Sequence, residues 1–335
     1  MQLPPDLRSA LERAVSGVPA ADLRRAAAAL SQRYRDVRPG RGGPLVRGPA
    51  DALAYAVTRL PATYAAVRGA LGQLAQAVPG LRPLHLLDVG AGPGTAAWAA
   101  AAVWPELSGV TLVERDEDMV RLGRRLAADA EAPALQAAEW VEQDLGRLAG
   151  LPARELVVAA YVLGEMREAQ QDALVDALWL AAGEALVLIE PGTPLGYAGV
   201  LRARSRLLAA GARIAAPCPH GDACPMAPGD WCHFAARVER SALHRQAKAA
   251  DLGHEDEKFA FVAAVRQAAD PAWSRVIRHP QVRSGHVRLT LCTPGGIREE
   301  VVPRSAGARF RTARDLVWGS QLDDADAAGE AQDEP

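Results

Sequence analysis

A short apolar run that leads directly into a glycine-rich turn constrains the fold of this 335-residue chain more than any other feature. The run Leu84–Val89 is followed by the turn Gly90–Gly94 and then by a helical stretch from Thr95 to Val103. Glycines allow unusual backbone dihedrals and let the backbone approach a ligand without an intervening Cβ atom. The N-terminal amides of the following helix point toward the same space. This order of strand, turn and helix predicts a nucleotide pocket at the carboxyl edge of a parallel sheet.

Further apolar runs follow and are mostly separated by helical stretches. The expected strands are Val110–Glu114, Trp140–Gln143, Leu156–Val162 and Ala185–Glu190. Runs that are apolar throughout are typical of a parallel sheet with both faces covered. We therefore expect an α/β fold with a doubly wound, Rossmann-like sheet and right-handed crossovers.

The residues around the turn indicate which nucleotide binds. Glu114 ends the second strand, where an acid accepts ribose hydroxyls, and Asp144 follows the third strand near the expected adenine. A dinucleotide fingerprint has glycine where this chain has Thr95, and a P-loop has a Gly-Lys-Ser/Thr ending that is absent. The motif resembles the first motif of class I S-adenosylmethionine (SAM)-dependent methyltransferases, which implies SAM as cofactor; a dinucleotide binder or a pocket kept only for structure is the alternative. The candidate cofactor-binding residues are Asp88, Gly90, Gly92, Gly94, Thr95, Glu114, Asp144 and Tyr161.

Four cysteines with the spacing C-x5-C-x7-C-x59-C form a second candidate site. They are Cys218, Cys224, Cys232 and Cys292. The first three lie in a loop of Pro, Gly, His and Asp that has too few apolar residues to fold alone, so a metal centre is expected to hold it. Four thiolates suit zinc or an iron–sulfur cluster. Because zinc ligand pairs are usually two to four residues apart, the wide spacing favours a [4Fe–4S] cluster. Zinc, or four free buried thiols, remains the alternative.

Positive charge gathers in the C-terminal half of a chain whose net charge is only −2. Residues 201–320 contain 19 Lys and Arg against 11 Asp and Glu, in arginine groups that include Arg204 and Arg275. Arginine forks on one face give salt-dependent affinity for phosphate, which predicts RNA binding; a solvated charged face is the alternative. The RNA-binding candidates are Arg202, Arg206, Arg213, Arg278, Arg283, Arg288, Arg309 and Arg311.

The patterns divide the chain into five expected parts. They are a helical region over residues 1–80, a Rossmann-like core over 81–205, a Cys-rich metal-cluster insertion over 206–250, a basic region over 251–320 and an acidic tail over 321–335. The strands expected in the fourth part, Lys258–Val265, His286–Cys292 and Ile297–Val302, are predicted to complete the sheet and the cluster site. The tail is predicted to be disordered.

Several motifs together resemble one family, the mitoribosomal small-subunit assembly factors and their bacterial homologues, which are predicted rRNA methyltransferases. The motifs are Arg59–Tyr64, Leu87–Thr95, Leu188–Pro194, Cys218-Pro219-His220, Cys224-Pro225, Trp231–Phe234 and Gly285–Val287 leading to Leu291-Cys292. The resemblance implies a class I methyltransferase fold and a [4Fe–4S] cluster on the four cysteines. It also implies binding to small-subunit rRNA in the pre-ribosomal small subunit.

Whether the chain transfers a methyl group is a separate question. After the fourth strand it has Ala159–Glu165 where amine-methylating enzymes usually carry an Asn/Asp-Pro-Pro-aromatic turn, and no cysteine is left over as nucleophile. The candidate catalytic residues are Tyr161, Glu165 and Glu190. We predict a SAM-binding, [4Fe–4S]-containing methyltransferase acting on small-subunit rRNA. The alternatives are a non-catalytic rRNA-binding assembly factor and a small-molecule or protein methyltransferase.

The overall composition is that of a globular protein, with 49% hydrophobic and 23% charged residues. No run approaches the roughly 20 apolar residues of a membrane span, and the N-terminus lacks the apolar stretch of a signal peptide. These features predict a cytoplasmic monomer.

Overall fold

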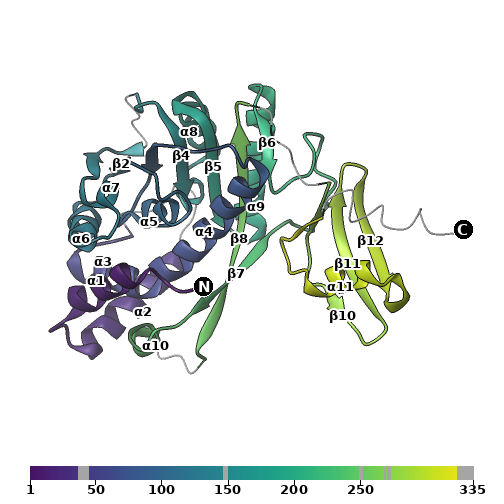
Figure 1. Ribbon diagram of the computed structural model, residues 1–335. Coiled ribbons are helices and arrows are strands. Elements are labelled where there is room, and N and C mark those ends of the chain that lie inside the picture. The colour runs from purple at the N-terminus through teal and green to yellow at the C-terminus, as the bar shows by residue number, and fades with distance from the viewer. Residues whose placement is uncertain (37–44, 146–149, 249–251, 268, 270–272, 323–335) are drawn as a thin grey trace, which may run out of the picture.

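A mixed eight-stranded sheet forms the centre of the computed structural model, which describes all residues except 37–44, 146–149, 249–251, 268, 270–272 and 323–335 (Figure 1). The strand order is β3-β2-β1-β4-β5-β8-β6, with β7 paired to β8. The bounds are β1 (His85–Val89), β2 (Gly109–Glu114), β3 (Glu139–Glu142), β4 (Arg154–Ala160), β5 (Ala182–Pro191), β6 (Arg213–Ala216), β7 (Phe234–Glu239) and β8 (His254–Val265). β1 to β5 are parallel, whereas β8 runs antiparallel to β5, β6 and β7. The predicted α/β fold is confirmed, and the strand order reverses beside β1, where such sheets bind ligands.

Both faces of this sheet are covered, because successive strand residues point to opposite sides. Leu86 and Leu156 pack on the side of α4 (Leu60–Ala77), α5 (Thr95–Ala101), α6 (Glu117–Ala127) and α7 (Pro133–Gln136). Leu87 and Val157 pack on the other side, beneath α8 (Glu168–Ala181) and α9 (Pro194–Ala209). The predicted doubly wound arrangement is therefore confirmed. Each helix that the structure describes is too short or too polar to cross a membrane.

The N-terminal residues form helices, as the sequence predicts. They are α1 (Pro5–Val15), α2 (Ala20–Asp36), α3 (Pro49–Thr58) and α4. Proline stands in the first turn of α1, α3 and α4, where its fixed φ suits a helix start and its missing amide hydrogen leaves no bond unmade. The helix pair α2–α3 packs against α10 (Ala242–Lys248), which joins β7 to β8.

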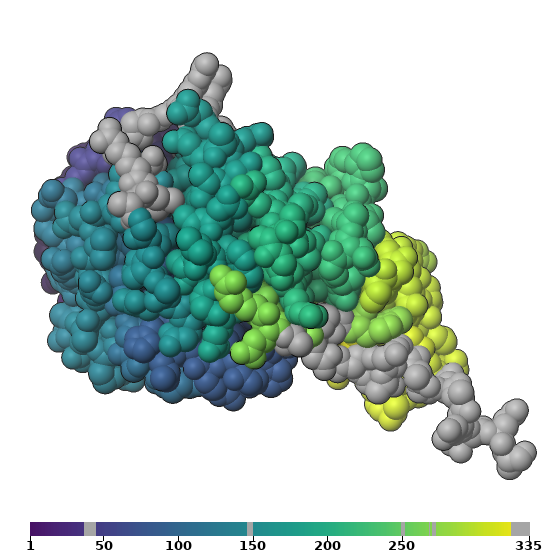
Figure 2. Space-filling view, turned by 90° about the horizontal axis from the view of Figure 1, so that it is seen from above, coloured from purple at the N-terminus to yellow at the C-terminus, as the bar shows by residue number. Residues whose placement is uncertain are grey.

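The C-terminal strands differ from the prediction, because only β8 enters the first sheet. β9 (Ser274–Val276), β10 (Gln281–Val282), β11 (His286–Thr293), β12 (Gly296–Pro303) and β13 (Gln321–Leu322) form a second sheet. The 3₁₀ turn η3 (Arg304–Ala306) leads from β12 into α11 (Ala308–Asp315), which packs on this sheet around Val276, Leu289 and Phe310. The hairpin β11–β12 pairs locally and has its own core, so it forms a separate lobe at one end of the molecule (Figure 2).

The first two residues of the predicted disordered tail are ordered in the structure. Gln321 and Leu322 pair with β9 as strand β13. The acidic residues from 323 onward lie outside the described residues.

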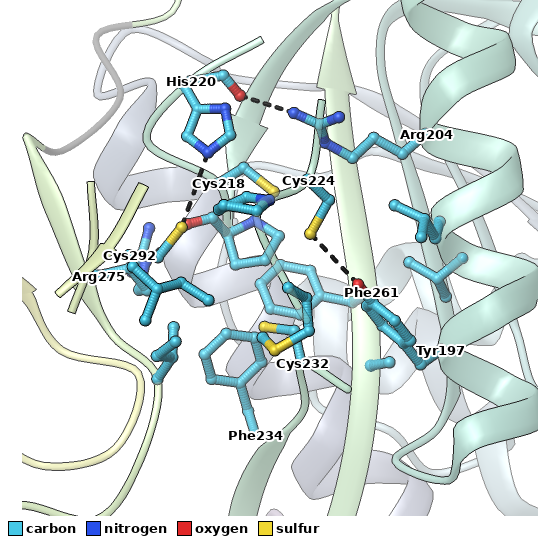
Figure 3. Close-up of a pocket in the computed structure, with 18 residues that line it drawn as sticks. Tyr197, Arg204, Cys218, His220, Cys224, Cys232, Phe234, Phe261, Arg275 and Cys292 are labelled. Atoms are coloured by element: carbon cyan, nitrogen blue, oxygen red, sulfur yellow. Dashed lines mark hydrogen bonds between the residues drawn. The ribbon is translucent and has the colours of Figure 1, made fainter. Parts of the chain in front are cut away.

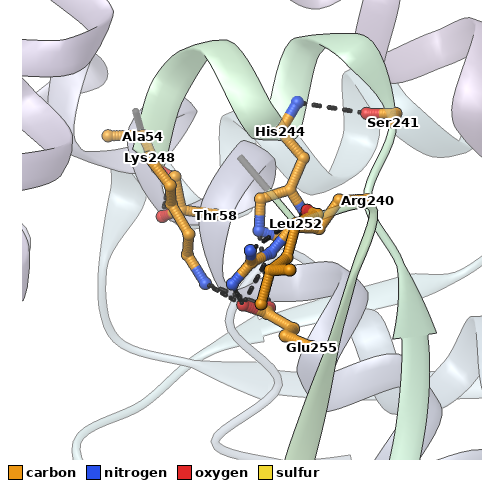
Figure 4. A network of polar contacts seen from close by, with 8 residues as sticks. All are labelled: Ala54, Thr58, Arg240, Ser241, His244, Lys248, Leu252 and Glu255. Atoms are coloured by element: carbon orange, nitrogen blue, oxygen red, sulfur yellow. Dashed lines mark hydrogen bonds and ion pairs between the residues drawn. The ribbon is translucent and has the colours of Figure 1, made fainter. Parts of the chain in front are cut away.

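A partly buried polar network joins α10 to the paired strands β7 and β8 (Figure 4). The carboxylate of Glu255 accepts hydrogen bonds from Arg240 Nη2 and Lys248 Nζ, both at 2.8 Å. His244 is 1% exposed and its Nε2 lies 3.4 Å from the same carboxylate. Burial, together with Lys248, lowers the pKa of His244 to about 4.

We expect this histidine to make the folded state sensitive to mild acid. The unfolded chain takes up a proton near pH 6.5, whereas folded His244 does so only near pH 4. Stability is therefore lost as the pH falls from 6.5 to 4, by about 3 kcal/mol. Burial opposes the ionisation of Glu255, but hydrogen bonds from Lys248 and Arg240 outweigh this effect, so the pKa of Glu255 is lowered in the folded protein. Protonation of Glu255 at still lower pH therefore removes further folding stability.

Urea unfolding at a series of pH values measures this effect. His244→Gln should flatten the decline between pH 6.5 and 4, whereas the control His286→Gln, in the second sheet, should leave it unchanged. Equal pH profiles for wild type and His244→Gln would contradict the prediction.

Candidate functional site

The glycine turn adopts a backbone that side chains rarely tolerate. Gly90, Gly92 and Gly94 have φ values of +73°, +54° and +83°. A Cβ atom on Gly90 would lie 2.5 Å from Val162 Cγ2, so this glycine is required for packing. A Cβ atom on Gly92 would meet no heavy atom within 4 Å. The backbone of Gly92 therefore borders open space at the carboxyl edge of β1, where a ligand can approach it.

Glu114 holds this turn in place. Its Oε2 accepts a hydrogen bond from the Gly92 amide at 2.8 Å, and its Oε1 accepts from Arg115 and Asp116 at 2.8 and 2.9 Å. A carboxylate has about four acceptor positions, so roughly one position remains for a ribose hydroxyl. Asp144 lies at the same edge, 3.8 Å from the Arg115 guanidinium. The sequence reasoning gave Glu114 only a ligand role and missed its role in shaping the turn.

Two predicted cofactor residues lie beneath the turn rather than at its surface. Asp88 is 1% exposed and Thr95 is 3% exposed. Within the described part of the chain, Asp88 Oδ2 and Thr95 Oγ1 have no hydrogen-bond partner. Burial raises the pKa of Asp88 to about 7, although a hydrogen bond from the Ala97 amide acts in the opposite direction and lowers it. Unpaired polar atoms below an open glycine backbone fit a pocket that receives a polar ligand.

Tyr161 directly follows β4, at the same carboxyl edge of the sheet as the glycine turn. Its φ is +62°, and no other non-glycine residue that the structure describes has a positive φ. Its hydroxyl donates to Glu257 Oε1 at 2.9 Å, although the two residues are 96 positions apart. Such a strained backbone at a pocket mouth is a common sign of a functional position. Glu257 was missed because only the tertiary fold brings β8 to this edge.

The other two catalytic candidates, Glu190 and Glu165, interact with groups of the protein itself. Glu190 is 2% exposed and accepts hydrogen bonds from the amides of Leu163 and Gly164 at 2.7 and 3.3 Å, so it fixes the turn η2 (Leu163–Glu165). Burial raises its pKa to about 7. Glu165 lies 3.8 Å from the Arg115 guanidinium, and burial raises its pKa. Of the three candidates, Glu190 therefore has a structural task that limits any role with a substrate.

All four cysteines line one cavity, whose empty space of about 590 Å³ is partly open to solvent (Figure 3). Cys218, Cys224 and Cys232 come from the segment between β6 and β7, and Cys292 comes from β11 of the second sheet. The cavity thus lies where the first sheet meets the C-terminal lobe. The structure brings together thiols that lie far apart in the sequence, since 59 residues separate even Cys232 from Cys292.

Burial raises the pKa of three of these thiols. Burial, followed by the neighbouring cysteines, raises the pKa of Cys292 to about 12 and also raises that of Cys232, and burial raises the pKa of Cys218 although Arg204 opposes it. Cys224 Sγ contacts the Tyr197 hydroxyl at 3.2 Å, and Cys292 Sγ contacts His220 Nε2 at 3.7 Å. Over the described residues, no three His, Cys, Asp or Glu side chains are arranged around a common metal position. The metal-binding role of the insertion therefore stays a prediction.

Two arginines that the sequence reasoning grouped with the basic surface lie inside this cavity instead. Arg204, on α9, is 4% exposed, and Arg275, on β9, is 2% exposed. Arg204 Nη2 donates to the His220 carbonyl at 2.9 Å, and Arg275 Nε donates to the Pro217 carbonyl at 2.9 Å. Burial lowers the pKa of Arg275 to about 10. The expectation that these two side chains face solvent is therefore wrong.

The remaining RNA-binding candidates divide between two parts of the molecule. Arg202, Arg206 and Arg213 belong to α9 and β6, whereas the others belong to or adjoin the second sheet. The candidates with carboxylate partners are Arg202, Arg206, Arg278, Arg288 and Arg309. Arg213, Arg283 and Arg311 are exposed and form no ion pair with any residue that the structure describes. Among the eight candidates, these three are the side chains most available to phosphate.

The chain is similar in sequence to proteins that are named as mitochondrial. The family model described as "Mitochondrial small ribosomal subunit Rsm22" matches residues 49–323. The human protein named "Ribosome assembly protein METTL17, mitochondrial" is 28% identical over 81% of this chain and 62% of its own length. The fission yeast protein named "Rsm22-cox11 tandem protein 2, mitochondrial" is 27% identical over 80% of this chain and 42% of its own length. The chain thus spans less than two thirds of either relative.

Solved structures of methyltransferases are also similar. Magnesium protoporphyrin IX methyltransferase from Synechocystis with bound SAM is 19% identical, with 71% of this chain and 91% of that chain covered and a TM-score of 0.41. Human N-acetylserotonin methyltransferase in complex with SAM is 14% identical, with 73% and 67% covered and a TM-score of 0.42. At such scores the fold assignment depends on the strand order described above.

The predicted cytoplasmic location is wrong by these comparisons. The family model and both relatives are named as mitochondrial proteins. The overall composition of a chain does not distinguish these two compartments.

Proposed function

Because the chain belongs to the Rsm22 family of mitochondrial small ribosomal subunit proteins, we propose that it is a ribosome assembly factor that binds small-subunit rRNA. In this proposal it holds SAM at the glycine turn and a [4Fe–4S] cluster at the four cysteines. The human relative is itself named a ribosome assembly protein.

The observation that carries the proposal is the cavity that collects all four cysteines beside the basic lobe. A cubane cluster requires four thiolates, and the chain offers four in one enclosure. Cys218, Cys224 and Cys232 would hold the insertion, and Cys292 would hold the lobe. When bound, the cluster supplies a four-point covalent link between these two parts, which sets the position of the lobe's arginines.

SAM would lie along the open backbone of Gly92, with its ribose at Glu114 and its adenine near Asp144. The strained Tyr161 at the mouth favours a second candidate function, transfer of the methyl group that SAM supplies to rRNA. In that case Tyr161 and Glu165 would orient the acceptor. A protein or small-molecule acceptor would use the same residues.

We expect the unpaired arginines of the lobe to contribute to RNA affinity. Replacing both Arg283 and Arg311 by Gln should weaken binding to a small-subunit rRNA fragment about tenfold and reduce the salt dependence by roughly two phosphate contacts. Filter binding or fluorescence anisotropy at several salt concentrations measures both quantities. The matched control replaces Arg24 and Arg25, both exposed on α2, by Gln. Equal weakening by the control pair would show that binding is not located on the lobe.

Incubation with labelled SAM and immature small subunits separates the two functions. Label in rRNA that Tyr161→Phe abolishes would support methyl transfer. Tight rRNA binding without label would support an assembly factor that uses SAM only as a bound ligand.

A further inference from the structure

Two buried positive charges face the cysteine cavity without an acidic partner. The guanidinium groups of Arg204 and Arg275 line it from opposite parts of the fold, α9 and β9 (Figure 3). Neither forms an ion pair with any carboxylate in the part of the chain that the structure describes. The Nε atom of Arg204 is buried and has no hydrogen-bond partner among the described residues.

Backbone carbonyls fix both side chains in this position. Arg275 donates to the Pro217 carbonyl through Nε and to the Gly319 carbonyl at 3.0 Å through Nη1. Arg204 donates to the carbonyl of His220 and interacts with the Cys218 sulfur. These bonds orient the guanidinium groups but do not neutralise them. Burying an unpaired cation costs several kcal/mol, so the cavity requires an anion as its occupant.

The chemistry of the thiols identifies that anion. Four thiolates around a cubane core of charge two plus leave two negative charges, which two guanidinium groups balance. Four neutral thiols leave the arginines without any counter-charge. The charge balance therefore favours the state in which all four sulfurs are deprotonated and share a metal centre.

We propose that Arg204 and Arg275 are a fixed counter-charge pair that positions the thiolate cluster and raises its reduction potential. This inference rests on the proposed function, because it concerns the cluster assigned there. Reduction adds one electron to the cluster and breaks no bond, so the net charge of the site becomes more negative by one. Nearby guanidinium groups and N–H···S contacts stabilise that reduced state more than the oxidised state.

A redox titration of the full-length protein tests the pair. Cluster-loaded protein, purified anaerobically, is titrated with dithionite and followed by electron paramagnetic resonance and visible absorbance. Arg204→Met and Arg275→Met keep side-chain bulk but remove charge. Each should lower the reduced fraction at a fixed potential about tenfold, which corresponds to about 59 mV for a one-electron couple. Arg204→Lys and Arg275→Lys keep the charge and should stay within about threefold of wild type.

Control measurements separate this inference from a general loss of structure. Arg213→Met, at the exposed first position of an otherwise buried β6, removes a positive charge outside the cavity lining and should leave the potential unchanged. If the Met variants do not fold, Arg204→Gln and Arg275→Gln, which each retain a donor, should show a smaller shift in the same direction.

The possible outcomes are distinct. A wild-type protein that contains no iron would overturn the proposed cluster. A loaded protein whose potential is unchanged in every charge-removing variant would overturn the counter-charge role and leave the cluster assignment intact. Equal shifts in the Lys and Met variants would show that hydrogen-bond geometry, not charge, sets the potential, and would also overturn the proposal.

Discussion

Replacing Cys292 by alanine is expected to leave the purified protein without iron and without the broad absorbance near ~400 nm of an iron–sulfur cluster. The reason is that Cys292 is the one cysteine that the C-terminal lobe contributes to the cavity. Four-thiolate metal sites contribute on the order of 10 kcal/mol to folding, so the lobe should also become far less stable. Iron analysis and urea unfolding measure the two effects.

The control for this experiment is Thr290→Ala, which alters the same strand, β11, but not the cavity. It should retain iron and lose little stability. A Cys292→Ala protein with full iron content and an unchanged unfolding midpoint would show that three cysteines and another group hold the metal, or that no metal is held there.

Gly92→Ala is expected to weaken SAM binding at least a hundredfold while leaving the chain folded. The added methyl group meets no protein atom and instead projects into the open space that the ligand would occupy. A hundredfold loss corresponds to about 2.8 kcal/mol. Forcing alanine into a left-handed conformation costs a further 1–2 kcal/mol or so of stability, which a large first sheet can absorb. Isothermal titration calorimetry with SAM measures the affinity.

Gly17→Ala supplies the matched control for backbone strain. Gly17 also has a positive φ, +84°, with no atom near its Cβ position, but it follows α1 and lies outside the glycine turn. It should lower stability by a similar amount and leave SAM affinity unchanged. Equal affinities in wild type and Gly92→Ala would indicate that SAM does not bind along this turn.

The sequence was a good guide where structure depends on contiguous residues. The strands β1, β2, β4 and β5 each contain an apolar run because their central residues are buried on both faces of the sheet, and that pattern is visible without a fold. The glycine turn is equally local, since its strand, turn and helix are adjacent in the chain. The lobe was not foreseen because a two-residue strand such as β10 leaves no pattern, and a hairpin does not reveal which sheet it joins.

The site was less predictable where distant segments meet. Nothing in the sequence distinguishes Arg204 and Arg275 from Arg213. Arg204 and Arg275 are nevertheless buried beside the thiols, whereas Arg213 is exposed. Glu257 reaches Tyr161 only because β8 extends past the end of β5. No local periodicity encodes either placement. The burial of Arg204 and Arg275 without carboxylate partners can be recognised only in the folded structure. It is also the strongest argument that the cavity binds an anionic group.

The position of β8 also imposes an order on synthesis and folding. β5 and β6 both pair with β8, although β6 leaves the ribosome well before β8 does. A nascent chain that ends near Ala216 therefore has an exposed β5 edge and a β6 segment without a partner. Exposed strand edges invite association between chains, and closure over such sequence distances is slow. In a growing chain the β5 edge therefore stays unpaired until residue 265 has emerged, and this exposure ends once the sheet is complete.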